Sequence, residues 1–328
     1  MKTRAPGRVN LIGDHTDYTG GLVFPMAINR WTEFEGEIAT NSISIHSEEE
    51  GSTVHFALGA PFDPAMTPSW GRYVSAVASV VNPQHGVNGK ISTTIPMGAG
   101  LSSSAALELA VAYALNDSIS PTSLALLMQQ AERIATGVPT GIMDQLCIAT
   151  AREGTATLID CSSLSVTHIP IPTDVHFIVQ FITRRSLEGS EYSDRVRECT
   201  DAEAVVGPLR TATLSDVAAI QDPVVAQRAR HVISENQRVT DFAKALTAGD
   251  YVGAGQLMTE SHLSLANDFA VSTPHMNGIV EALCATPGVY GARMTGGGFG
   301  GCVVAMCEPE TALNGWHVEA VGAAHRVN

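Results

Sequence analysis

The sequence predicts two closely packed α+β domains with a boundary near residue 172. A length of 328 residues is long for one core, because a domain typically takes roughly 100–200 residues. Hydrophobic residues make up 45% of the chain, which is enough for two buried cores and argues against disorder. The first half alternates short strand-like runs with turns, whereas residues 190–270 are strongly helical. We therefore expect an N-terminal domain over 1–172 and a C-terminal domain over 173–328.

The N-terminal domain is predicted to hold an antiparallel or mixed sheet followed by helices. Period-two alternation and β-branched residues predict five strands, over residues 7–13, 32–40, 42–48, 52–58 and 89–97. Helical apolar spacing follows over 102–115 and 123–136. Ser and Thr precede or begin both segments, as is typical near helix N-caps.

The C-terminal domain is predicted to begin with the strand "VHFIVQFIT", residues 175–183. The helical region 190–270 follows, with apolar residues spaced by three and four in "DFAKALTAGDYVGAGQLM". Two further strands, over 289–296 and 302–308, flank a glycine-rich turn. No low-complexity linker or repeat separates the two halves.

Composition excludes several classes of function. The formal charge is −14, from 33 acidic and 19 basic residues, whereas a general nucleic-acid binder has a basic face. A small anionic ligand is still possible, because backbone amides and a metal ion can hold phosphate in an acidic protein. The six cysteines form no CxxC pair, so we expect small, buried, reduced residues. Without a signal-peptide pattern or an apolar run of about 18 residues, a cytoplasmic protein with no membrane partner is expected.

The first stretch that indicates chemistry is "GRVNLIGDHTDYTGG", residues 7–21. It places the carboxylates of Asp14 and Asp17 beside the imidazole of His15. Carboxylates and imidazole suit vicinal hydroxyls, because each accepts or donates hydrogen bonds with fixed geometry. A single histidine such as His15 would more often be a structural residue with satisfied hydrogen bonds.

The second stretch, "PMGAGLSSSAALE" over residues 96–108, has the character of a phosphate loop. Gly98 and Gly100 allow close approach of the backbone to a ligand. Three serines then begin an apolar helix, whose free N–H groups and positive dipole end favour a polyphosphate. A plain glycine turn with a serine N-cap explains the same residues. The common P-loop is excluded, because Gly89 and Lys90 lack the glycine and hydroxyl residues that the motif requires around them.

Two more stretches complete the set. "MTGGGFGGC", residues 294–302, has five glycines in seven positions, which indicates tight turning or close ligand approach. A dinucleotide fingerprint is disfavoured there, because a strand and not a helix follows. In "AERIATGVPTGIMDQL", residues 131–146, Glu132 lies on a predicted helix and Asp144 follows turn signals. Taken alone, most such acids are caps or solvated turn residues.

The order of these stretches resembles the galactokinase branch of the GHMP small-molecule kinases. The similarity runs from residue 5 to about 307 and includes "GSEY" at 189–192 and "ARHVISENQRV" at 229–239. The resemblance implies an N-terminal mixed-sheet domain and a ferredoxin-like C-terminal domain, with the active site in the cleft between them. It also implies ATP-dependent phosphorylation of the anomeric hydroxyl of galactose or a similar sugar.

The resemblance also implies roles for particular residues. Asp144 matches the general base, Arg8 the arginine that polarises it, and Ser104 with Glu132 the ligands of Mg²⁺. The implied sugar-binding residues are Asp14, His15, Asp17, Gly141, Asp144 and Tyr192. The implied ATP-binding residues are Pro96, Gly98, Ala99, Gly100, Leu101, Ser102, Ser103, Ser104 and Trp70. Trp70 matches an aromatic position near the adenine pocket, but a core position explains it equally well.

The sequence departs from the family pattern at several points. Asp14 stands where galactokinases have Glu, which withdraws the carboxylate by about 1.5 Å at the C6 end of the hexose. We therefore expect weaker or altered discrimination at C6. Arg184 and Arg185 make the entry to the "GSEY" segment unusually basic. The chain also begins close to its first motif, and its C-terminal domain looks shortened, with a helix missing before the last strand.

These departures keep other functions open. One alternative is a 1-kinase for N-acetylgalactosamine, galacturonate or a deoxyhexose, and Arg184 with Arg185 would suit a uronate. Another is a catalytically weak regulator that binds sugar and ATP. Joint retention of Arg8, Asp144, Ser104 and Glu132 argues against the regulator, which needs neither a base nor metal ligands. A small-molecule sugar and ATP are the expected partners of a monomer or weak homo-oligomer.

Overall fold

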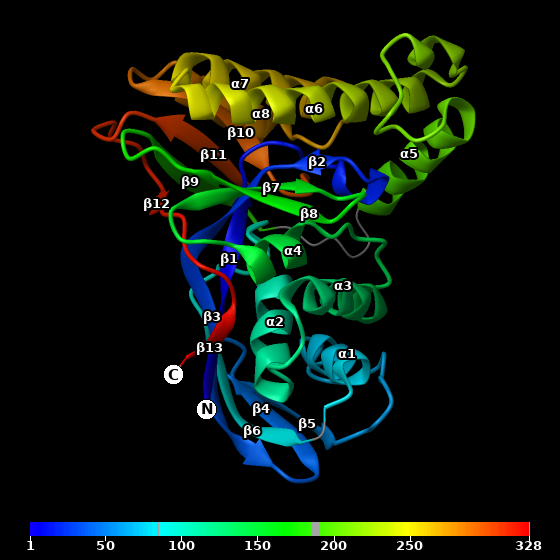
Figure 1. Ribbon diagram of the computed structural model, residues 1–328, viewed down its shortest axis with the longest axis vertical. Coiled ribbons are helices and arrows are strands. Elements are labelled where there is room, and N and C mark those ends of the chain that lie inside the picture. Colours follow the sequence, from blue (N-terminus) through cyan, green and yellow to red (C-terminus); the bar gives the residue numbers. More distant parts are fainter. Residues whose placement is uncertain (84, 185–190, 328) are drawn as a thin grey trace.

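The computed structural model describes residues 1–83, 85–184 and 191–327. Five strands of the first half and β13 from the C-terminal end of the chain form a six-stranded sheet in the order β13-β1-β3-β6-β4-β5 (Figure 1). β4 runs parallel to β6 and all the other neighbours are antiparallel, so the predicted mixed sheet is confirmed. The strands are β1 (Lys2–Asn10), β3 (Pro25–Ala39), β4 (Ser42–Ser47), β5 (Ser52–Ala57), β6 (Gly86–Thr93) and β13 (His325–Val327).

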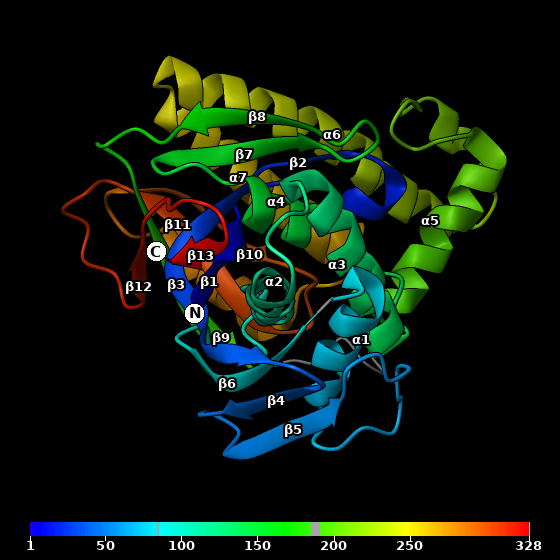
Figure 2. The same cartoon turned by 60° about the horizontal axis from the view of Figure 1, so that its bottom comes forward.

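Four helices accompany this sheet: α1 (Gly71–Val81), α2 (Ser103–Leu115), α3 (Pro121–Thr136) and α4 (Met143–Thr150). α2 packs on β1 and β3 and lies at the centre of the view in Figure 2. Most of its residues are buried, as expected for a helix that is apolar on nearly every side. α3 begins where the sequence places a cap, because the Ser120 hydroxyl accepts the N–H of Ser123 and Pro121 occupies the first turn.

The second half contains a four-stranded antiparallel sheet in the order β10-β11-β9-β12. Its strands are β9 (His176–Thr183), β10 (Val289–Thr295), β11 (Gly301–Cys307) and β12 (Trp316–Val318). Numbered along the chain, this order is 2-3-1-4, which is that of the expected ferredoxin-like sheet. In residues 308–315, all of which the structure describes, no helix separates β11 from β12.

The described part of this second half has the helices α5 (Tyr192–Val206), α6 (Pro223–Ala248), α7 (Tyr251–Asn267) and α8 (Pro274–Cys284). α7 and α8 pack on β10. α6 and α7 lie side by side as a pair (Figure 1). A 3₁₀ turn, η2 (Asp216–Ala219), connects α5 to α6.

A small third sheet, β2-β7-β8, lies between the two halves. It consists of β2 (Leu22–Val23), β7 (Thr155–Asp160) and β8 (Ser165–Pro170), and the 3₁₀ turn η1 (Asp17–Thr19) precedes it. β2 also packs against α6. The segment between β1 and β2 is therefore held beside the second half of the chain.

The burial pattern fits two cores. One cluster of buried apolar residues lies mainly in the first half, and a second gathers around α5, α6, α8 and β10. All six cysteines are free and five are buried. None of the described helices combines the length and the apolar character needed to cross a membrane.

Candidate active site

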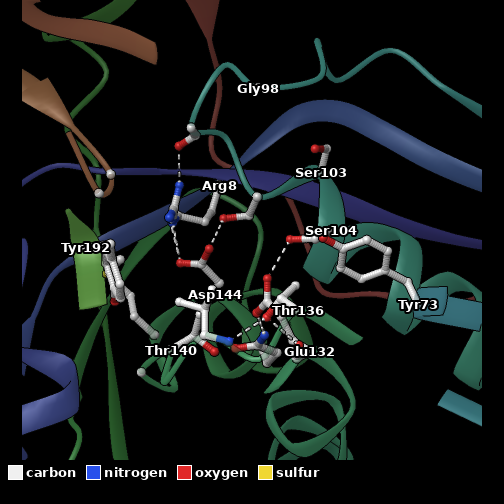
Figure 3. A pocket seen from close by; sticks show the side chains of 18 of the residues that line it. Arg8, Tyr73, Gly98, Ser103, Ser104, Glu132, Thr136, Thr140, Asp144 and Tyr192 are labelled. Carbon is white, nitrogen blue, oxygen red and sulfur yellow. Dashed lines mark hydrogen bonds and ion pairs between the residues drawn. The ribbon is translucent and has the colours of Figure 1, made fainter. Parts of the chain in front are cut away.

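A cavity of about 420 Å³ lies where the segment after β1, the start of α2 and the start of α4 meet. This volume is within the range of roughly 300–1,000 Å³ that is typical of small-molecule sites. Its walls include the expected sugar-binding residues and most of the phosphate loop, and Figure 3 shows the cavity from close by. The structure thus brings together motifs that are far apart in the sequence.

Arg8 and Asp144 form the central contact of the cavity (Figure 3). The Arg8 Nε and Nη2 atoms lie 2.8 and 2.6 Å from Asp144 Oδ1, and Arg8 Nη1 donates to the Gly100 carbonyl at 2.6 Å. Burial disfavours the charged guanidinium, but the carboxylates of Asp144 and Asp14 outweigh it and raise the pKa of Arg8. Arg8 is therefore a fixed positive charge between Asp144 and the phosphate loop.

Ser102 joins Asp144 from the other side. Its hydroxyl donates to Asp144 Oδ2 at 2.5 Å, so each carboxylate oxygen of Asp144 has a partner. Ser102 has a left-handed backbone with φ of 62°, and its side chain makes no cap to α2. The side chain of Ser102 therefore orients Asp144, and the phosphate contact of Ser102 stays a prediction.

The phosphate loop turns through three left-handed residues: Gly98 at φ 71°, Gly100 at φ 75° and then Ser102. Gly98, Gly100, Ser102, Ser103 and Ser104 line the cavity. Ala99 and Leu101 bury their side chains in the core instead. Neither these two residues nor Pro96 lines the cavity, so any contact they make with a nucleotide would come from the backbone.

Ser104 and Glu132 are adjacent on the opposite wall from Tyr192 (Figure 3). The Ser104 hydroxyl donates to Glu132 Oε1 at 2.8 Å. Gln145 Nε2 donates to Glu132 Oε2 at 2.5 Å, which fixes the plane of the carboxylate. No group of three or more His, Cys, Asp and Glu side chains among the described residues could hold a metal ion on its own.

The other expected sugar residues also line the cavity, namely Asp14, His15, Asp17, Gly141 and Tyr192. Asp14 is only 1% exposed: its Oδ1 accepts the Gly296 N–H at 3.1 Å and its Oδ2 lies 2.6 Å from Arg293 Nη2. His15 adopts a left-handed backbone with φ of 65°, and its Nδ1 lies 3.0 Å from the Tyr18 hydroxyl. Its ring packs against that of Tyr192, with centroids 5.4 Å apart.

Asp17 is held against the turn before α4. Its Oδ2 accepts the Met143 N–H at 3.3 Å, and a Cβ atom on Gly141 would lie 1.7 Å from the same oxygen. Gly141 is therefore required for the close approach of this carboxylate. Burial, reinforced by the charge of Asp144, raises the pKa of Asp17 to about 6.

Sequence reasoning missed several residues of the cavity wall. They include Tyr73, Thr136, Thr140 and Gln145, whereas Gly296 and Gly297, which also line the wall, lie in the glycine-rich stretch for which the sequence predicts close ligand approach or tight turning. Two signals were available: Gln145 directly follows Asp144, and Tyr73 lies three residues after Trp70, on the same face of a helix. Trp70 and Arg184 also line the cavity, whereas Arg185 lies outside the described residues.

The geometry agrees with three family models that match the chain. They are the galactokinase galactose-binding signature over residues 2–34, the GHMP kinase N-terminal domain over 72–152 and the GHMP kinase C-terminal model over 242–316. Human galactokinase is 41% identical over 95% of this chain and 85% of its own. Galactokinase of Chloroflexus aggregans is 41% identical over 94% of this chain and 84% of its own.

Solved structures agree with this assignment. The crystal structure of Lactococcus lactis galactokinase complexed with galactose aligns with a TM-score of 0.90 at 27% identity, over 99% of this chain and 95% of that one. A mevalonate kinase aligns with a TM-score of 0.68 at 21% identity, over 94% and 92% of the two chains, which shows the fold alone. The chain belongs to the galactokinase family of GHMP kinases.

Proposed function

We propose that the protein transfers the γ-phosphoryl group of ATP to the anomeric hydroxyl of galactose, giving galactose 1-phosphate and ADP. One observation carries the proposal: Arg8 bridges the Asp144 carboxylate and the Gly100 carbonyl inside one cavity. Arg8 therefore joins the phosphate loop to Asp144 in the same cavity that the sugar loop lines, the sugar loop being residues 11–21 between β1 and β2. Phosphoryl transfer needs this arrangement, because it depends on in-line positioning and charge compensation more than on covalent chemistry.

Asp144 is the proposed proton acceptor. With Oδ1 held by Arg8 and Oδ2 by Ser102, its carboxylate has a fixed orientation toward the cavity. Oδ1 accepts two N–H groups of Arg8, whereas Oδ2 accepts the Ser102 hydroxyl alone. Oδ2 therefore keeps a lone pair that can accept the proton of the anomeric hydroxyl as the O–P bond forms. Arg8 compensates charge that develops on the transferring phosphoryl oxygens.

The phosphates are assigned to the start of α2. Backbone N–H groups of the left-handed turn around Gly98 and Gly100, and the positive end of the α2 dipole, favour the anionic chain. Trp70, which lines the same cavity, is assigned to the adenine side. Its indole N–H already donates to the Ser52 hydroxyl at 3.0 Å, so the ring has a fixed orientation.

Ser104 and Glu132 fit a magnesium ion that arrives with the nucleotide. A hydroxyl and a carboxylate oxygen 2.8 Å apart supply the hard oxygen ligands that Mg²⁺ prefers, with phosphates and water completing its shell. When bound, the ion would neutralise phosphate charge. Gln145 keeps the Glu132 carboxylate facing Ser104, which prepares the pair for a cation.

The sugar is assigned to the residues at the other end of the cavity. Asp17 and His15 present a carboxylate and an imidazole to vicinal hydroxyls, and Tyr192 adds an aromatic face beside them. Gly141 leaves the space that the Asp17 carboxylate needs. Asp14 lies at the end assigned to C6, where Arg293 and Gly296 draw its carboxylate toward the second half of the chain.

ADP release over a panel of sugars tests the proposal. With ATP and Mg²⁺, we expect turnover with galactose and not with glucose, and no turnover when a chelator removes the metal. Asp144→Asn should lower kcat by about 10²–10⁴-fold. Asp160→Asn is the matched control, because Asp160 also pairs with an arginine, Arg210, at 2.6 Å but lies outside the cavity.

Three other outcomes of the sugar panel and the Asp144→Asn assay would change or refute the proposal. Turnover with galacturonate, N-acetylgalactosamine or a deoxyhexose in preference to galactose would change the substrate while keeping the reaction. Binding of sugar and ATP without turnover would support a regulator and refute the kinase. A folded Asp144→Asn protein that loses less than about tenfold in kcat would remove Asp144 from the mechanism.

A further inference from the structure

The loop that carries the proposed sugar residues is anchored on helix α6, which belongs to the other half of the chain. Glu235 Oε1 accepts the Gly13 N–H at 2.9 Å, and Asn236 Oδ1 accepts the Leu22 N–H at 2.7 Å. His231 Nε2 lies 3.1 Å from the Asp14 carbonyl oxygen. Both ends of the loop are therefore fixed by side chains from about two turns of one helix.

Glu235 is the charged centre of this anchor. Its side chain is fully buried, its Oε1 also accepts the Ser261 hydroxyl at 2.5 Å, and its Oε2 accepts Arg238 Nε at 2.7 Å. Burial alone would raise the pKa of Glu235, but the charge of Arg238 and its other neighbours outweighs burial and lowers the pKa to about 2. Glu235 is therefore ionised throughout the working range of an enzyme.

Glu235 also shares a buried cation with Asp14. Arg293 is fully buried on β10, and within the described part of the chain its ion partners are Asp14 Oδ2 at 2.6 Å and Glu235 Oε1 at 3.9 Å. A buried cation needs compensation from each neighbouring anion. If Glu235 lost its charge, Arg293 would depend on Asp14 alone and would draw that carboxylate further from the cavity.

We propose that Glu235 is a positioning residue for sugar binding. Through the Gly13 N–H, Glu235 fixes the position of the loop relative to α6. Through Arg293, it fixes the position of the Asp14 carboxylate. Glu235 itself does not line the cavity, so it acts only through these neighbours. The inference rests on the proposed function, because it assumes that the cavity holds a sugar at this loop.

The test compares two variants at this position. Glu235→Gln keeps the size and removes the charge, and we expect the KM of the sugar to rise about tenfold, since a hydrogen bond to a charged group is lost. The KM of ATP and kcat should stay within about threefold of the wild-type values. The reason is that the substitution weakens sugar binding equally in the ground state and the transition state, which raises the sugar KM without changing kcat. Glu235→Asp keeps the charge but withdraws it from the Gly13 N–H, and should raise the sugar KM by about threefold.

Glu198→Gln is the matched control. Glu198 is also on a helix of the second half and also pairs with two arginines, Arg195 at 2.7 Å and Arg228 at 2.8 Å. Among the described residues, its ion-pair partners are these two arginines and not residues of the sugar loop. We expect this variant to lower Tm while the sugar KM stays within about twofold of wild type. If the role of Glu235 were purely structural, Glu235→Gln would behave like Glu198→Gln: Tm would fall and the sugar KM would stay near the wild-type value.

The outcomes separate this inference from the proposed function. The KM ratios are measured with whichever sugar the wild type phosphorylates, and calorimetry without ATP gives the same comparison for binding alone. No turnover by the wild type with any sugar refutes the proposed function. An unchanged sugar affinity in both Glu235 variants, a parallel rise in the KM of ATP, or failure of both variants to fold refutes the positioning role.

Discussion

Asp17 is expected to give the reaction a pH dependence that its position in the cavity explains. Burial and the neighbouring Asp144 raise the pKa of Asp17 to about 6, although the Met143 N–H opposes this shift. Lowering the pH through this value protonates the carboxylate. A protonated Asp17 loses one acceptor site and its negative charge, so it should hold vicinal hydroxyls less well.

The magnitude follows from the ionised fraction. A group with a pKa of about 6 is about nine-tenths ionised at pH 7 and about one-tenth ionised at pH 5. If only the ionised form binds the sugar productively, kcat/KM for galactose should fall about tenfold between these two values. The KM of ATP should not follow the same curve, because Asp17 lies at the sugar end of the cavity.

The assay is ADP release between about pH 5 and pH 8 with galactose varied at saturating ATP. Burial also raises the pKa of Asp14 and of Glu132, so the same profile is needed for Asp17→Asn to assign the inflection. That variant should have a low kcat/KM without the inflection near pH 6. A flat wild-type profile, or an inflection that survives in Asp17→Asn, would refute this reasoning.

Two substitutions test the sugar end of the cavity further. Gly141→Ala should raise the KM of galactose by about tenfold or more, because the new Cβ would lie 1.7 Å from Asp17 Oδ2. The control is Gly278→Ala, whose new Cβ meets no atom within 4 Å. This control variant should leave the steady-state kinetics unchanged. Asp14→Glu should increase the kcat/KM preference for galactose over fucose, because it extends the carboxylate by about 1.5 Å toward the C6 end of the sugar. An unchanged preference would contradict the assignment of Asp14 to C6.

Local signals predict some helices of this fold and not others. The start of α3 follows from Ser120 and Pro121, because a cap and a proline act within one turn. The N-terminal caps of α1 and α4 make no side-chain hydrogen bond, and α4 has only eight residues, so tertiary packing decides both helices. α8 was missed although Thr273 caps it and Pro274 begins it, so its signal was present in the sequence.

Local sequence signals likewise predict some parts of the candidate site and not others. The glycine and serine pattern predicts the phosphate loop, and Asp144 follows the predicted turn signals, although the sequence did not predict the helix α4 in which it lies. The family resemblance implies the contact between Arg8 and Asp144, but residue patterns alone predict neither this contact nor that of Ser102, because the two residues reach Asp144 across 136 and 42 residues. The pairing of Asp14 with Arg293 across the two halves is likewise a property of the assembled fold, and residue patterns within either half do not encode it.

Anchoring of the sugar loop on α6 and β10 also has a consequence for biosynthesis. Gly13 is separated from Glu235 by 222 residues, and Asp14 from Gly296 by 282. Because synthesis runs from the N-terminus, the loop is among the first segments to leave the ribosome, whereas these partners follow 222 and 282 residues later. Galactose therefore cannot assist early folding steps, and a nascent chain should acquire sugar affinity only after β10 has emerged.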